Sequence, residues 1–68
     1  MLLSSASVEK LIRKAGAYRV SEDAKVVLTG ILEDYAMSIS KEAVKLCEHA
    51  KRKTVKQEDI RLAHERLR

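Results

Sequence analysis

The 68-residue chain has no proline, phenylalanine or tryptophan. It has only two glycines and one cysteine. A single cysteine cannot form an internal disulfide, which favours a reducing, intracellular setting. Because 46% of the residues are hydrophobic and glycine is scarce, the chain is not a disordered basic tail. The apolar runs are far shorter than a membrane span, and the first residues, MLLSSAS, lack the basic start and long apolar core of a secretion signal. The length favours a single domain over residues 1–68 and excludes a typical catalytic scaffold.

Positive charge is in excess, with fourteen Lys and Arg against ten Asp and Glu, giving a formal net charge of +4. A monomer of this size buries only about 60% of its unfolded surface and is marginally stable without help. The sequence offers neither a disulfide nor a convincing metal cluster. Association with another chain is therefore the expected source of additional stability.

The first segment with helical spacing covers about residues 5–15. Ser4 or Ser5 can cap its start, and Gly16 can provide its C-terminal stop. Apolar residues form one stripe and basic residues gather on another face, which is either a solvated surface or a binding surface. The stripe consists of Val8, Leu11, Ile12 and Ala15, and the basic group of Lys10, Arg13 and Lys14.

The second predicted helix begins after Ser21 and continues to about Ala50, a length of about 45 Å. Glu22 and Asp23 in its first turn complement the helix dipole. Gly30 either weakens this helix by about 1 kcal/mol or permits a close approach on its face. Apolar residues form a broad stripe along the whole of this helix. Because two short helices cannot cover so long a stripe, two copies crossing at their middles are expected to form an intertwined homodimer.

The third predicted helix follows Thr54. The four residues from Thr54 to Gln57 fit a capping box, in which the Gln57 side chain reaches back to the amide of the cap. Ile60, Ala63 and Leu67 carry its apolar stripe. The predicted fold class is therefore all-α, with a short helix, a long central helix and a short helix.

Several stretches, taken together and at their spacing, resemble the archaeal histones, which are tail-less members of the histone-fold family. They are Ala15-Gly16-Ala17, Arg19-Val20-Ser21, Asp23-Ala24, Ile31-Leu32-Glu33, Glu42-Ala43, His49-Ala50, Arg52-Lys53-Thr54-Val55-Lys56, Glu58-Asp59-Ile60 and Leu62-Ala63. The resemblance covers residues 3–67. It implies a handshake homodimer in which the first joint of one chain runs beside the second joint of its partner. Val20 and Val55 would then lie in short paired strands.

The resemblance also implies binding of double-stranded DNA with little sequence specificity. Dimers would wrap and compact the DNA and assemble end to end into nucleosome-like superhelical fibres. Arg19 matches the arginine that enters the minor groove, and helix starts at Ser21 and Thr54 would seat phosphates. Tyr18 can flank DNA beside Arg19, whereas Tyr35 is predicted to be a core residue. The implied DNA-contacting residues are Lys10, Arg13, Arg19, Ser21, Lys53, Thr54 and Lys56.

Other positions match contacts between histone-fold elements. Arg52 and Asp59 match an intrachain salt bridge that braces the second joint, and a four-helix bundle would join dimers. Lys14 and Glu48 reverse charges common in relatives, so their swapped pair could preserve attraction between superhelical turns; Lys51 stands where relatives often have glycine. Gly30, Asp34 and Glu65 would not support other stacking contacts of the family. The implied dimer–dimer residues are Leu46, His49, Asp59 and Leu62.

Three alternatives compete with DNA packaging by a homodimer. The chain could pair with a histone paralogue, or it could be a histone-fold dimerisation subunit of a transcription complex, although no extensions beyond the fold are expected. An enzyme is disfavoured because no nucleophile–base pair or phosphate loop is present. Cys47 is interpreted as core filler, and its i, i+2 spacing from His49 diverges on a helix, so neither a metal site nor a cofactor is expected. The expected location is the cytoplasm, on the chromosome, with no membrane partner.

Overall fold

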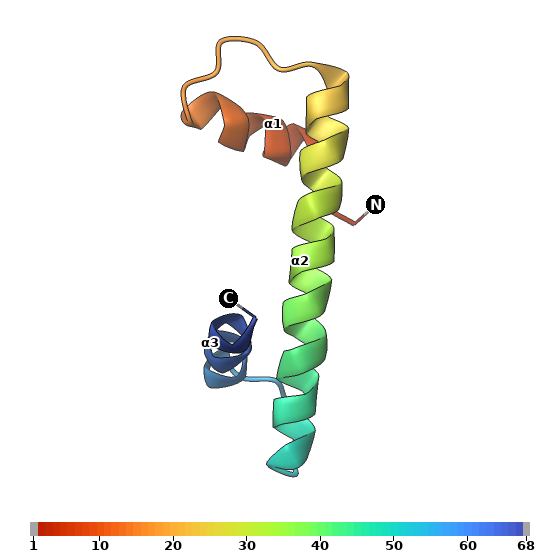
Figure 1. Ribbon diagram of the computed structural model, residues 1–68, viewed down its shortest axis with the longest axis vertical. Helices are drawn as coiled ribbons and strands as arrows, with labels where there is room; N and C mark the ends of the chain where they lie inside the picture. Colours follow the sequence, from red (N-terminus) through yellow and green to blue (C-terminus); the bar gives the residue numbers. More distant parts are fainter. Residues whose placement is uncertain (1, 68) are drawn as a thin grey trace. The chain divides into compact units, whose positions relative to one another are not determined.

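A computed structural model describes residues 2–67 of the chain. It contains three helices, α1 (Ser5–Lys14), α2 (Glu22–His49) and α3 (Gln57–Arg66), and no strand within residues 2–67 (Figure 1). The predicted all-α order of short, long and short helices is confirmed. The chain consists of two compact units. The first ends at Asp34, the second begins at Tyr35, and each contains part of α2. No helix in the described residues has the length and apolar character needed to cross a membrane.

Local sequence signals set both ends of α1. The Ser4 hydroxyl accepts a hydrogen bond from the Ser7 amide at 3.4 Å. At the other end the Gly16 amide donates to Arg13 O at 3.0 Å and the Ala17 amide to Ile12 O at 3.4 Å, the two bonds of a Schellman motif. Gly16 has φ +118°, a conformation that glycine adopts without steric cost. The predicted cap and stop are confirmed, and the helix ends one residue earlier than expected.

The first unit packs α1 against the N-terminal half of α2 around a small core. Val8 and Thr29 are its buried side chains, and the Thr29 hydroxyl donates to Lys25 O at 2.7 Å. Lys25 Nζ also contacts Glu9 Oε1 at 3.1 Å, which joins the two helices by an ion pair. The Leu3 amide donates to Glu33 Oε1 at 2.8 Å and holds the segment before α1 against α2.

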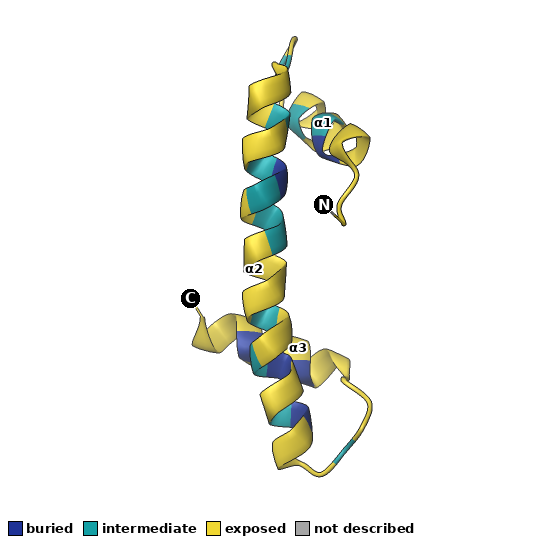
Figure 2. Ribbon diagram, turned by 90° about the vertical axis from the view of Figure 1, so that its right-hand side faces the viewer, coloured by how far each residue is buried: buried dark blue, intermediate teal, exposed yellow. Residues whose placement is uncertain are grey.

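The second unit packs α3 against the C-terminal half of α2, where the buried residues gather (Figures 1 and 2). Ala43, Cys47 and Ala63 are buried, and Arg66 pairs with Glu42 at 3.1 Å. The Cys47 placement confirms its interpretation as core filler.

Tyr35 corrects the prediction of a core tyrosine, since its side chain is exposed in the second unit. Its hydroxyl lies 2.7 Å from His64 Nδ1, and the two rings meet edge to face. The polar end of the phenol thus finds a partner on α3, while the ring faces water on the single chain.

The beginning of α3 differs from the prediction. Its N-cap is Lys56, and Thr54 lies two residues earlier, so the expected Thr54–Gln57 capping box is wrong. The Asp59 carboxylate instead accepts from the Lys56 amide at 2.8 Å. An ammonium cannot accept a hydrogen bond, so Asp59 supplies the side-chain half of the cap by itself. A negative carboxylate already occupies the helix start that had been expected to seat a phosphate beside Thr54.

Large apolar side chains remain exposed on both units. Leu11, Val27 and Ile31 of the first unit are each more than half exposed, at 57%, 61% and 58%. In the second unit Met37, Val44, Ile60, Leu62 and Leu67 are exposed. Only four hydrophobic residues of the described chain are buried. Each unit therefore presents apolar surface that the chain does not cover by itself.

Candidate nucleic-acid interface

The loop between α1 and α2 presents a cation from a fixed backbone. Arg19 is exposed and forms no ion pair within residues 2–67. After it, the Ser21 hydroxyl accepts from the Ala24 amide at 3.1 Å and caps α2. Ser21 thus caps the helix at its predicted start, and its neighbours Glu22 and Asp23 place two carboxylates in the first turn. The negative charge of these carboxylates would repel a phosphate bound at the same helix start.

The basic face of α1 contains two different kinds of residue. Lys10 and Lys14 are exposed and have no ion-pair partner in the described part of the chain. The Arg13 guanidinium instead contacts Glu9 at 2.9 Å and 2.8 Å and donates to Tyr18 O at 3.0 Å. A phosphate contact by Arg13 would have to compete with these bonds.

Sequence reasoning missed Glu9 and Lys25, which complete this network. Lys25 Nζ lies between Glu22 at 2.6 Å and Glu9 at 3.1 Å. The hydrogen bonds from Lys25 and then Arg13 lower the pKa of Glu9, and those to Glu22 and then Glu9 raise the pKa of Lys25. The i, i+4 spacing of Glu9 and Arg13 was the available signal, because such residues are neighbours on a helix.

The loop between α2 and α3 is held by a second polar network. Arg52 makes a two-bond ion pair with Asp59, at 2.7 Å and 2.9 Å, and also donates to Thr54 O at 3.1 Å. The Cys47 thiol donates to Arg52 O at 3.2 Å and to Thr54 O at 3.3 Å. The ion pair implied by the resemblance is thus present, and the loop backbone is tied to both flanking helices.

The Arg52–Asp59 pair changes the titration of both groups. The hydrogen bonds from Arg52 and then from the Lys56 amide lower the pKa of Asp59 to about 2 from an ordinary value of 3.8. Asp59 in turn raises the pKa of Arg52. Both groups therefore stay charged throughout the neutral range, and Asp59 is 4% exposed.

The cations left around this loop face solvent. Lys53 and Lys56 are exposed and have no ion-pair partner in residues 2–67. The Thr54 side chain is exposed, while its carbonyl is used inside the loop. Residues 50–56 contain four cations and no acid. Both loops thus combine an anchored backbone with free positive side chains, an arrangement suited to a phosphate-rich partner.

Comparison with known proteins decides the family. Residues 1–63 match the family described as histone-like transcription factors (CBF/NF-Y) and archaeal histones. The chain belongs to this histone-fold family. It is 56% identical over 61 residues to a subunit of the archaeal histone HAN1 of Thermococcus zilligii, covering 90% of this chain and 91% of that protein. It is 48% identical over 54 residues to probable archaeal histone 3 of Methanocaldococcus jannaschii, covering 79% and 81%.

Family membership supports a histone-fold DNA-binding protein of chromatin and implies dimerisation through the fold. The relatives named above are histones rather than enzymes. Within residues 2–67 no three His, Cys, Asp or Glu side chains are grouped so that they could hold a metal ion. The histone fold and the two cationic loops are therefore the features on which a more specific function must rest.

The residues implied in contacts between histone-fold dimers have different environments. Leu46 is half-buried, and His49 and Leu62 are exposed. Asp59 is buried and already paired with Arg52, so its carboxylate is less available than the resemblance implied. Lys14 and Glu48, the hypothetical stacking pair, are both exposed.

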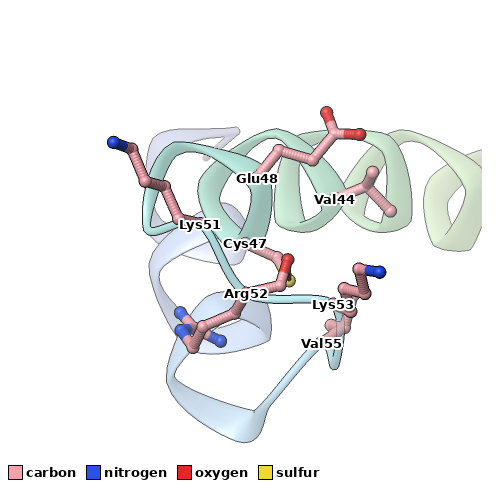
Figure 3. A pocket seen from close by; sticks show the side chains of 7 residues that line it. All are labelled: Val44, Cys47, Glu48, Lys51, Arg52, Lys53 and Val55. Carbon is pink, nitrogen blue, oxygen red and sulfur yellow. Dashed lines mark hydrogen bonds between the residues drawn. The ribbon is translucent and has the colours of Figure 1, made fainter.

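A hollow of about 510 Å³ opens beside the second loop of this histone-fold chain. Figure 3 shows the Lys51 and Lys53 ammonium groups extending in different directions around it, with the Cys47 sulfur near the loop backbone. Apolar and charged side chains share its wall. The lining residues are Val44, Cys47, Glu48, Lys51, Arg52, Lys53 and Val55.

Proposed function

We propose that this histone-fold protein packages duplex DNA. A homodimer would bind DNA with little sequence preference, wrap it, and assemble end to end with other dimers into a superhelical fibre. The proposed location is the chromosome in the cytoplasm. Membership of the family supports DNA binding in general. Wrapping and fibre assembly are the parts that this proposal adds.

One observation carries the proposal: four of the cations at the proposed contact positions stay free, and of these positions only Arg13 is held in an internal ion pair within the described residues. Glu9, Glu22, Glu42 and Asp59 are each paired within their own unit. Lys10, Arg19, Lys53 and Lys56 are exposed and have no ion-pair partner among residues 2–67. Residues 10–21 contain four cations and no acid, and residues 51–56 contain four cations and no acid, so the positive excess lies on α1 and the two loops. A dimer would carry a formal charge of +8 (+4 and +4).

Exposed apolar side chains on α2 support the dimer in this proposal. Val27 and Ile31 on α2 are more than half exposed on the single chain. A soluble chain gains about 25 cal/mol for each Å² of such surface that it buries against a partner. Two copies that cover each other's α2 would bury these side chains without any further element.

Nuclease protection tests the packaging function. Duplex DNA is mixed with the protein at modest salt and digested, and the protected fragments are sized. A ladder that grows by a fixed step is expected, because dimers would add in series along the DNA. Unprotected DNA at modest salt would contradict the proposal.

The Arg19→Ala variant tests the mode of binding. Affinity should fall by a similar factor on unrelated sequences, since phosphate and groove-shape contacts carry no base-specific hydrogen bonds. Glu65→Ala removes an exposed charge from α3 and is the control expected to leave this affinity pattern unchanged. A loss confined to one DNA sequence would indicate base readout instead.

A second candidate is a histone-fold subunit that pairs with a different chain, either a paralogue or a partner in a transcription complex. The matched family includes transcription factors, and the Thermococcus zilligii relative is named as a subunit. Light scattering of the protein alone separates the two candidates. A stable homodimer favours packaging, whereas a monomer that becomes stable only with a different histone-fold chain favours the second candidate.

A further inference from the structure

Tyr18 is an exposed aromatic residue at the centre of the first loop. Its side chain is 89% exposed, about twice the 43% of Tyr35, the other tyrosine of the chain. A tyrosine ring has an apolar body and a polar tip, and such side chains are enriched where proteins bind partners. Keeping this apolar ring in water costs free energy, so Tyr18 is the side chain of the loop that would gain most from contact with a partner.

The backbone that holds Tyr18 is fixed on both sides. Before it, the Ala17 amide bonds to Ile12 O; at the residue itself, Tyr18 O accepts from Arg13 Nη1 at 3.0 Å. Arg13 is in turn held by Glu9, and Ser21 anchors the chain again by capping α2. Figure 1 shows this loop as the extended connection between α1 and α2. Arg13 thus positions Tyr18, and the exposed ring is presented from an anchored main chain.

The charge around Tyr18 indicates the kind of partner. Residues 15–21 contain one cation, Arg19, and no acidic residue. Arg19 follows Tyr18 directly and is exposed. An apolar ring next to a free guanidinium suits a partner that offers apolar surface beside negative charge. The deoxyribose and phosphate of duplex DNA present these two together along each groove wall.

We propose that Tyr18 packs its ring against deoxyribose at the edge of the groove that Arg19 would enter. The contact rests on the proposed DNA-binding function and adds to it a term that does not depend on salt. Phosphate contacts weaken as salt rises because counterions are released. An apolar contact releases no counterions, so it leaves the dependence of affinity on salt unchanged.

Tyrosine fluorescence tests the contact directly, because the chain has two tyrosines and no tryptophan. In the Tyr35→Phe variant, all emission comes from Tyr18, and adding a short duplex should quench it. In the matched Tyr18→Phe variant, emission comes from Tyr35, and the same duplex should change it much less. Equal responses of the two variants, or no response of Tyr18, would overturn the contact.

Affinity measurements separate the ring from the charge. Tyr18→Ala should weaken duplex binding roughly 5-fold, with an unchanged slope of log affinity against log salt. Tyr18→Phe should keep the affinity, because it keeps the ring. Lys53→Ala is the charge control: it should reduce the steepness of the slope by about 1 for each phosphate that is no longer neutralised.

The outcomes distinguish this inference from the function on which it rests. A wild-type protein that binds DNA while Tyr18→Ala binds equally well would overturn the contact and leave DNA binding intact. Wild-type protein that fails to bind the duplex would overturn both. If Tyr18→Ala weakens dimerisation without DNA and leaves DNA affinity per dimer unchanged, the ring belongs to a chain–chain contact and the proposal is wrong.

Discussion

Lys51 is the only non-glycine residue with a positive φ, 57°, among residues 2–67. The Lys51 amide donates to Glu48 O and the Arg52 amide to Cys47 O, at 2.9 Å and 3.0 Å. These are the two bonds of a Schellman motif, which α1 forms with a glycine at the same position. A side chain therefore stands where the backbone geometry favours none, and relatives with glycine there would avoid the steric cost.

Lys51→Gly should raise the free energy of unfolding by about 0.5–1 kcal/mol, because glycine removes the left-handed strain but loses more chain entropy on folding. Chemical denaturation at matched protein concentration measures the change. Lys53→Gly is the control, since it removes the same charge from the same loop at a residue without positive φ. Destabilisation by Lys51→Gly as large as that by Lys53→Gly would contradict the strain argument.

Asp59 couples the second loop to pH. Its pKa is lowered to about 2 by Arg52 and the Lys56 amide, so its stabilising effect is complete above the ordinary value of 3.8. It declines as pH falls from about 4 toward 2, where the folded-state carboxylate becomes protonated. Asp59→Asn should therefore destabilise the protein at neutral pH, and the difference from wild type should narrow through this acid range.

Denaturation of both proteins as a function of pH checks this expectation. The amide side chain introduced by Asp59→Asn would keep an oxygen that can accept from the Lys56 amide, so the variant isolates the charge from the cap. Asp59→Ala removes both and should be less stable than Asp59→Asn at neutral pH. A difference between wild type and Asp59→Asn that stays constant down to pH 2 would show that the ion pair is not responsible.

At the scale of whole helices, the sequence predicted α1 and α2 to within one residue because local signals decide their ends. Ser4, Gly16 and Ser21 each act at the helix end where they stand. The start of α3 was mispredicted because Thr54 and Asp59 both fit capping patterns. The resemblance implied the Arg52–Asp59 pair, but not that this pair holds the carboxylate where it accepts from the Lys56 amide.

The interior of α2 contains Gly30, and a Cβ added there would meet no heavy atom within 4 Å on the single chain. Gly30→Ala should therefore stabilise the protein by about 1 kcal/mol through helix propensity. Thermal and chemical denaturation measure the gain. Ala36→Gly, at an exposed position of the same helix, is the reverse control and should lose a similar amount. Destabilisation by Gly30→Ala would instead indicate that a partner chain approaches this face closely.

For the molecule as a whole, the sequence predicted that the chain cannot cover its own apolar surface, and Val27 and Ile31 agree with this. The sequence did not predict how its charges are distributed between surface and internal pairs. Arg13 matched the family's DNA-contacting positions, yet Glu9 holds its guanidinium within the first unit. Spacing identifies which residues share a helix face, whereas the competition between an internal carboxylate and an external phosphate depends on tertiary placement.

The apolar surface of the single chain leads to a prediction about assembly. If dimerisation completes the fold, the melting temperature should rise with protein concentration, because association shifts unfolding by mass action. Calorimetry over about a hundredfold range of concentration measures the shift. Ile31→Asn should lower the melting temperature most at low concentration, because it weakens association at an exposed position. A melting temperature independent of concentration would contradict a dissociable dimer.

The buried Cys47 thiol provides a chemical measure of local opening. It is 3% exposed and donates to two carbonyls of the second loop, so an alkylating reagent can reach it only after that loop separates from α2. Since it is the sole thiol of the chain, its alkylation rate reports this one event. Local opening requires less free energy than global unfolding, and a ligand that holds the loop raises that cost. Slower alkylation in the presence of duplex DNA would therefore show that bound DNA suppresses the opening of this loop. The measurement requires no substitution in the protein.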